Sequence, residues 1–169
     1  MSLSVEPSYH HERMDYLQTD TSNCSLGRTV ELVGEPWVML ILREIVQGVH
    51  RFSDMQAHMG VSKSVLSARL EHLVENGILE RRDYREPGQR RRCSYHLTEK
   101  GRDLYPVLAA LRQWGDKHLA GPEGPALLVT HAGCGAPVQA ALVCDHGHRV
   151  GLGEIERRPG PGARVRSAA

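Results

Sequence analysis

Polar and apolar residues follow no regular pattern over residues 1–22, and we expect a flexible N-terminal arm there. From Cys24 onward the apolar residues recur at the spacing of α-helices. The stretch SLGRTVELVG predicts a helix that ends at Gly34, and PWVMLILREIVQG predicts a second helix that begins at Pro36. Because the second stretch is apolar on almost every face, we expect its helix to lie at the centre of the core.

Two short helices follow, and their spacing predicts a helix-turn-helix. In FSDMQAHMG, Ser53 with Gln56 three residues later is a capping-box signature, and Gly60 ends the helix. In VSKSVLSARLEHLVENG, Ser62 is the expected cap, and the helix ends at the Asn-Gly pair. On a helical wheel the apolar side of this second helix consists of Leu66, Leu70 and Leu73.

The opposite side of that helix, over residues 62–75, is the candidate surface for reading DNA. Its first half carries small, polar and basic side chains, which suit a major groove because they add little bulk and can hydrogen-bond to base edges. An ordinary surface helix has a similar pattern, so the helix by itself leaves both interpretations open. The candidate DNA contacts on it are Ser62, Lys63, Ser64, Ser67, Ala68 and Arg69.

Six arginines lie within the thirteen residues RRDYREPGQRRRC, residues 81–93, around a Pro-Gly pair that predicts a turn. After the turn, Cys93, Tyr95 and Leu97 alternate with polar residues, as in a half-buried strand. A hairpin over 80–97 that directly follows a helix-turn-helix predicts a winged helix. Arginines at the tip of such a wing can pair with phosphates or enter the minor groove. The candidate wing contacts are Arg90, Arg91 and Arg92.

The formal net charge is only +1, but the charges are unevenly placed along the chain. Residues 1–62 carry four basic and eight acidic side chains, whereas residues 63–102 carry ten basic and six acidic ones. The basic segment contains the second helix of the predicted helix-turn-helix and the wing, which favours a polyanionic partner. A solvated arginine-rich loop is the alternative interpretation.

A long amphipathic helix is predicted in TEKGRDLYPVLAALRQWGDKHL, capped by Thr98 and bent at Pro106. Its apolar stripe is larger than a small winged domain can cover. A two-fold partner is the usual solution, so we expect a homodimer that places two recognition helices about one turn of DNA apart.

These residues together resemble the HxlR family of bacterial transcription regulators over about residues 24–118. The likeness lies in three stretches in family order, which are CSLGRTVELVGEPWVMLILREIVQGVHRFSDMQAHM, VSKSVLSARLEHLVENGILERRDY and SYHLTEKGRDLYPVLAALRQWG. The resemblance implies a homodimeric winged-helix protein that binds near a promoter, with its terminal helices in the dimer interface. The sequence departs from the family pattern at GEPW, residues 34–37, where a GGKW-like run is usual.

The resemblance also matches Cys24 to an N-terminal cysteine that is a thiol sensor in some family members. A sensing thiol needs thiolate character and exposure, and Arg28 lies one helical turn further on. The other interpretation of Cys24 is a small packing residue near the dimer interface.

Residues 120–158 lie beyond the resemblance and contain the pieces HAGCG and LVCDHGH. They predict a small zinc-ribbon-like β extension with His131, Cys134, Cys144 and His146 as candidate ligands of a structural zinc ion, with His148 as the alternative to His146. A metal-free hairpin is the alternative. We expect a winged-helix and dimerisation domain over 23–119 and a disordered tail over 159–169. The fold class is thus mainly α with a small β-hairpin wing.

The sequence therefore favours a homodimeric, DNA-binding transcriptional regulator, which we expect to be a repressor. The alternative is a metal- or thiol-responsive repressor of the ArsR or MarR type, with Cys24 or the His/Cys tail as sensor. An enzyme at that tail and a winged helix used only for protein contacts are less favoured, and no cofactor is expected to be required.

The expected partners are double-stranded operator DNA, a second copy of the chain and a small-molecule effector that the sequence does not identify. No apolar run approaches the roughly 20 residues that span a bilayer. The N-terminal stretch lacks the basic and apolar regions of a signal peptide. We expect a cytoplasmic protein without membrane contacts.

Overall fold

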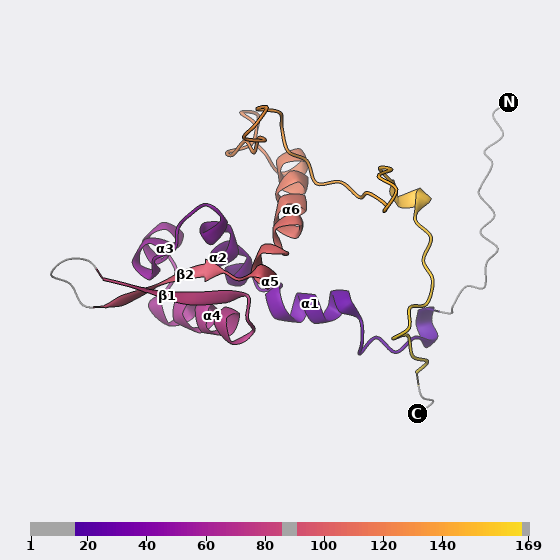
Figure 1. Ribbon diagram of the computed structural model, residues 1–169, viewed down its shortest axis with the longest axis horizontal. Helices are drawn as coiled ribbons and strands as arrows, with labels where there is room; N and C mark the ends of the chain where they lie inside the picture. The colour runs from indigo at the N-terminus through magenta and orange to yellow at the C-terminus, as the bar shows by residue number, and fades with distance from the viewer. Residues whose placement is uncertain (1–15, 86–90, 167–169) are drawn as a thin grey trace.

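The structure, a computed structural model, describes residues 16–85 and 91–166 (Figure 1). Its elements form a winged helix-turn-helix from which α1 (Ser25–Val33), α6 (Tyr105–His118) and a long C-terminal extension project. In chain order they are η1 (Tyr16–Gln18), α1 (Ser25–Val33), α2 (Pro36–Val46), α3 (Phe52–Met59), α4 (Lys63–Glu75), β1 (Leu79–Tyr84), β2 (Arg92–Leu97), α5 (Glu99–Arg102), α6 (Tyr105–His118) and η2 (Leu152–Glu154).

The central helix is α2, as its apolar pattern predicts. It buries residues on several faces, because α3, α4, α6 and β2 all pack against it. The short turn before it depends on Gly34, where a Cβ atom would lie 2.5 Å from the carbonyl oxygen of Val30. The buried hydrophobic core consists of Val33, Val38, Ile41, Leu42, Ile45, Met55, Val61, Leu66, Leu70, Leu73, Ile78, Leu79 and Tyr95.

The helix-turn-helix consists of α3 and α4. The predicted cap of the first helix at Ser53 is wrong, because α3 begins at Phe52 with Arg51 in the capping position. The Ser53 hydroxyl instead donates to the Asp54 carboxylate at 3.0 Å. The left-handed Gly60, with φ of 64°, ends α3 as predicted.

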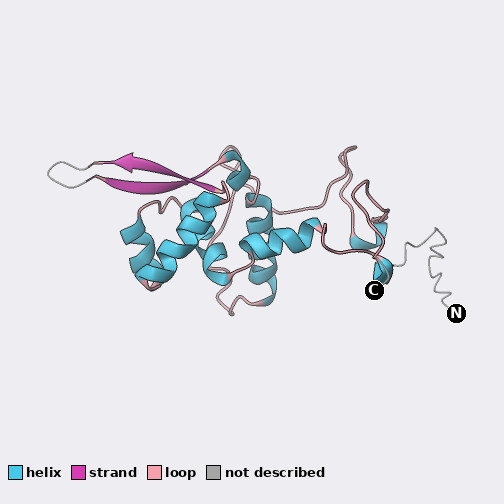
Figure 2. Ribbon diagram, turned by 90° about the horizontal axis from the view of Figure 1, so that it is seen from below, coloured by secondary structure: helices cyan, strands magenta, loops and turns pink. Residues whose placement is uncertain are grey.

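The wing is an antiparallel hairpin in which Leu79 pairs with Leu97 and Tyr84 with Arg92 (Figure 2). The side of β2 that carries Tyr95 faces the core. The backbone N–H of Tyr95 also donates to the carbonyl oxygen of His50 at 2.9 Å, and Arg51 forms a β-bridge with Ser94. The loop before α3 and the wing are therefore joined by backbone hydrogen bonds.

The predicted long bent helix is two helices. Thr98 caps the first, α5, by accepting from the Gly101 N–H at 3.1 Å, as expected. Asp103 and Leu104 keep right-handed helical dihedral angles but form a turn, and α6 begins at Tyr105 with Pro106 in its first turn. A proline lacks the N–H of a helix interior but is tolerated in a first turn, so it breaks the helix here instead of bending it.

The predicted zinc-ribbon-like β architecture is not present in residues 120–166. This part of the chain contains two tight turns, each closed by an isolated β-bridge, Thr130 with Pro137 and Val143 with Arg149. Further along, Val165 forms a bridge with Thr19, next to η1. Of the described helices, none has the length and apolar character to cross a membrane.

Candidate nucleic-acid interface

Helix α4 presents one polar face to solvent. Its leucine side is fully buried against the core, which fixes the rotation of the helix about its own axis. The opposite side of its first two turns carries the exposed residues Lys63, Ser64, Ser67 and Ala68. None of these side chains is bulky or acidic, so the face is compatible with a major groove.

The Ser62 side chain caps α4. Its hydroxyl oxygen accepts from the backbone N–H of Val65 at 3.3 Å and lies 3.2 Å from the hydroxyl oxygen of Ser64. Such a cap stabilises a helix by about 1 kcal/mol. Ser62 thus positions α4, and the Ser64 hydroxyl beside it is exposed in the first turn.

Arg69 is held by the chain itself. Its Nε atom lies 2.5 Å from a carboxylate oxygen of Glu35, at the start of α2, and the residue is half-buried. A contact between Arg69 and DNA, which the sequence predicts, therefore requires that this ion pair open. The other candidate residues of α4 need no such rearrangement.

Helix α3 is anchored through a buried carboxylate on α2. Glu44 accepts from the Arg43 Nε atom at 2.9 Å and lies 2.6 Å from the Nδ1 atom of His58 on α3. Burial by itself would raise the pKa of Glu44, but the hydrogen bonds from His58 and Arg43 outweigh it and lower the pKa below 4.5. The charged carboxylate thus ties α3 to the central helix.

The arginines of the wing divide into paired and unpaired ones. Arg81 pairs with Glu71, Arg82 with Glu80 at 2.7 Å, and Arg91 with Asp83. All three pairs are exposed, and exposed ion pairs contribute only about 0–1 kcal/mol, so a phosphate can compete for these arginines. Within the described residues, Arg85 and Arg92 are exposed and have no acidic partner. Arg90 and the predicted Pro87-Gly88 turn lie outside the described residues.

Two stacked histidines join the wing to the loop before α3. The rings of His50 and His96 lie 4.3 Å apart between centroids, and His50 Nδ1 donates to the Tyr95 carbonyl oxygen at 3.0 Å. Burial lowers the pKa of His96 below its ordinary value of 6.5; His50 and Arg82 lower it further, and Glu80 opposes them. This stack fixes the root of the wing relative to the helix-turn-helix.

Arg51 is a functional candidate that the sequence analysis missed. It precedes α3, and its guanidinium lies 4.8 Å from the centre of the Tyr84 ring at the outer end of β1. The stacking holds a cation between the helix-turn-helix and the wing. The signal in the sequence was an arginine directly before a predicted helix of a helix-turn-helix.

Cys24 lies at the N-cap of α1, where its Sγ atom is 3.5 Å from the N–H of Gly27. The Arg28 side chain donates to the side-chain Oδ1 atom of Asn23, at 3.5 Å, rather than turning to the thiol. The half-buried thiol thus acts as a helix cap, and a sensing role for it stays a prediction.

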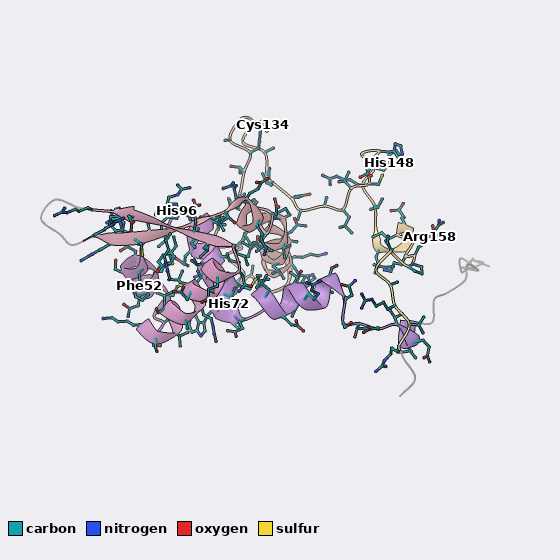
Figure 3. All side chains as sticks on the ribbon, turned by 60° about the horizontal axis from the view of Figure 1, so that its bottom comes forward. Phe52, His72, His96, Cys134, His148 and Arg158 are labelled. Carbon is teal, nitrogen blue, oxygen red and sulfur yellow. The ribbon has the colours of Figure 1, made fainter. Side chains whose placement is uncertain are left out.

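The candidate zinc ligands fall on two separate turns. The Nδ1 atom of His131 lies 3.3 Å from the Sγ atom of Cys134, whereas Cys144 and His146 belong to the second turn. Figure 3 shows Cys134 and His148 at well-separated points of the extension. In the described part of the chain, no three His, Cys, Asp or Glu residues are grouped so that they could hold a metal ion. The structure does not assemble the predicted four-ligand set, and the zinc site stays a prediction.

The sequence matches the HxlR-like helix-turn-helix family over residues 32–122. This range includes α2 to α6, and so contains the helix-turn-helix and the wing. An uncharacterized HTH-type transcriptional regulator of Mycobacterium tuberculosis is 41% identical over 146 residues, which cover 86% of this chain and 91% of that protein.

Two candidate transcription factors of known structure are similar to most of this chain. PA1607 is 30% identical, with a TM-score of 0.72 over 82% of this chain and 96% of its own. PA1374 from Pseudomonas aeruginosa is 34% identical, with a TM-score of 0.57 over 83% of this chain and 95% of its own. Only 119 of the 169 residues precede the extension, so both similarities include part of it.

Proposed function

The chain belongs to the HxlR-like helix-turn-helix family and is a DNA-binding transcriptional regulator, and we propose that it acts as a homodimeric repressor. In this proposal, the exposed face of α4 reads operator bases in the major groove. The wing and Arg51 contact phosphates on either side of that groove.

The observation that carries this proposal is that α4 and the wing, the two elements proposed to contact DNA, are fixed to the same core. The wing root is bonded to the loop before α3 through Tyr95 and His50, and α4 packs against both α2 and β1. A face without bulk or negative charge and a cationic hairpin are therefore held in one arrangement. Such pre-organisation lowers the entropic cost of binding a duplex.

The dimer part of the proposal rests on the apolar side chains of α1 and α6. Helix α6 has no buried residue, and its Leu111 and Trp114 side chains are 53% and 58% exposed. On α1, Leu26 and Val30 are also exposed. A two-fold partner that covers both helices would remove this apolar surface from water and pair two copies of α4.

The test is to retain genomic DNA fragments on the purified full-length protein, sequence them, and measure binding to the enriched site by fluorescence anisotropy. We expect a site with two-fold symmetry, two chains per duplex, and an affinity at least 10³-fold above that for random DNA, as is typical of specific regulators. The affinity should fall steeply as salt is raised, because each neutralised phosphate releases counterions. Binding without sequence preference or salt dependence would contradict the proposal.

Repression is tested separately with a reporter gene behind the enriched site. Expression of the protein should lower the reporter output, because a dimer on the promoter excludes the polymerase. A rise in output with the same operator would make the protein an activator and leave the DNA-binding mode intact.

A further inference from the structure

Exposed apolar side chains are confined to the parts of the chain that flank the winged helix. Over residues 31–104, no large hydrophobic residue within the described range is exposed. The fifteen exposed ones are Leu17, Leu26, Val30, Tyr105, Val107, Leu111, Trp114, Leu119, Leu127, Leu128, Val138, Leu142, Val143, Leu152 and Val165. Clustered exposed apolar side chains mark an interaction site, and here they are concentrated on α1, on α6 and in the residues that follow α6.

The C-terminal extension, residues 120–166, is attached to the rest of the chain at two distant points. Near its middle, the side chain of Gln113 on α6 bonds to the backbone of Ala140, accepting from its N–H at 2.8 Å and donating to its carbonyl oxygen at 3.4 Å. Near its end, the backbone N–H of Asp20 donates to the carbonyl oxygen of Arg164 at 2.9 Å, and the backbone N–H of Arg166 donates to the carbonyl oxygen of Gln18 at 2.8 Å. The two attachments hold the extension between the end of α6 and the segment before α1 (Figure 1).

Between these attachments the extension leaves its apolar side chains uncovered. Residues 142–150 form a turn closed by their own hydrogen bonds, from Val150 to Leu142 at 3.1 Å and from Cys144 to His148 at 3.0 Å. The Leu142 and Leu152 side chains are 60% and 75% exposed. The stretch runs clear of the winged helix in both ribbon views (Figures 1 and 2).

We propose that the extension is a clasp for a second copy of this chain, in which residues 141–155 pack against α1 and α6 of the partner subunit. The clasp rests on the homodimer proposed above. Its first support is continuity, because the extension connects the two helices whose exposed apolar faces need a partner. A two-fold axis then lets each copy cover the same surface of the other, as a symmetric dimer requires.

The second support is that part of the extension recurs with the winged helix. The similarity to PA1607 covers 82% of this chain at a TM-score of 0.72, and so extends beyond α6. The extension buries few of its apolar side chains against the winged-helix core. It would therefore gain stability from a partner that covers them. A second copy is the one partner that is present whenever the chain itself is.

The direct test is photo-crosslinking in the full-length protein, with p-benzoylphenylalanine in place of Leu142. Copies labelled with ¹⁴N and ¹⁵N are mixed, irradiated and digested, and the crosslinked peptides are identified by mass spectrometry. We expect mixed-isotope pairs between the extension and α1 or α6. The control carries the same crosslinker in place of Ala57, which is exposed on α3, and should give no mixed pair with those helices. Crosslinks confined to single-isotope pairs would overturn the clasp.

A second measurement uses the dimer dissociation constant from analytical ultracentrifugation. The double variant Leu142→Asp, Leu152→Asp should raise it by roughly tenfold or more, because it places two charges in an apolar contact. Ala132→Asp, which adds an acid at an exposed turn of the extension, should change it by less than about twofold. Circular dichroism establishes that the variants retain the helical fold.

The outcomes separate the clasp from the dimer. If the double variant dimerises like the wild type and no mixed-isotope pair forms, the clasp is wrong and the homodimer stands. If the unmodified chain sediments as a monomer at every concentration, both are wrong.

Discussion

At the scale of single residues, the wing shows why an arginine count alone does not identify a DNA contact. Arg91 and Arg92 are neighbours in the chain, yet Arg91 pairs with Asp83, and Arg92 pairs with no described acid. Tyr84 pairs with Arg92 across the hairpin, and the guanidinium of Arg51 stacks on the Tyr84 ring. The outer end of the wing therefore gathers cations from two elements.

We predict opposite effects for two substitutions at the wing. Arg92→Ala should reduce the slope of log affinity against log salt by about 0.9, since it removes one phosphate contact. Asp83→Asn should tighten DNA binding about two- to fivefold, because it frees Arg91 from an exposed pair. Both effects are measured by anisotropy over a salt series.

Arg158→Ala is the control for Arg92→Ala. Both arginines are exposed, and Arg158 pairs with Glu156, whereas Arg92 pairs with no described acid. Arg158 lies in the extension, far from α4, so its removal should leave the salt slope unchanged. Equal reductions of the salt slope in Arg92→Ala and Arg158→Ala would show that only net charge determines the slope, and would contradict a specific wing contact.

Arg51 is predicted to contact a phosphate while it stacks on Tyr84. Arg51→Ala should weaken binding to the operator and to random DNA by a similar factor and should lower the salt slope by about one unit. Arg51→Lys should keep the slope but weaken binding, because lysine retains the charge and loses the planar stacking. An unchanged slope in Arg51→Ala, measured by anisotropy, would place Arg51 outside the interface.

At the scale of elements, the pattern of the sequence predicted the helices that depend on local signals. Ser62, Gly60 and Thr98 end or begin their helices as their residue types indicate. The signal failed at Ser53, where the β-bridge between Arg51 and Ser94 starts α3 earlier than a capping box would. Such a bridge joins residues far apart in the chain, so no local pattern could reveal it.

The His50–His96 stack predicts a pH dependence at the root of the wing. The folded protein lowers the pKa of His96, so the unfolded chain binds the proton first as the pH falls below 6.5. The free energy of unfolding should therefore be highest above pH 6.5 and should decrease below it. Urea titrations of wild type and His96→Phe, between pH 5 and pH 7.5, measure this.

The His96→Phe variant keeps an aromatic ring beside His50 and removes the titrating group. We expect its stability to depend less on pH in that range than the wild type does. Parallel pH profiles for the two proteins would assign the dependence to other groups.

At the scale of the whole molecule, the sequence predicted the winged helix better than the extension. The core residues from Val33 to Tyr95 recur with the period of a helix or a strand, and this periodicity predicts which of them are buried. The extension has cysteines and histidines in ribbon-like spacing, but its two turns lie apart and contain isolated bridges only. Spacing along the chain indicates which residues could bind zinc, and only the path of the chain brings them together.

The apolar face of α6 predicts that the dimer is sensitive to charge at one position. Leu111→Asp should raise the dimer dissociation constant by roughly tenfold or more, because Leu111 is exposed in the single chain and covered in the proposed dimer. DNA binding should weaken in parallel, since two linked half-sites bind more tightly than one. Sedimentation and anisotropy on the same samples check both; a dimer of wild-type strength would exclude α6 from the interface.

The central claim is that two chains bind one DNA duplex, each through its own α4 and its own wing. Hydroxyl-radical footprinting of the enriched operator tests it most directly. We predict two protected patches related by two-fold symmetry and about one helical turn apart, with the flanking protection lost in Arg92→Ala. A single patch, or a footprint that the wing substitution leaves intact, would contradict the account.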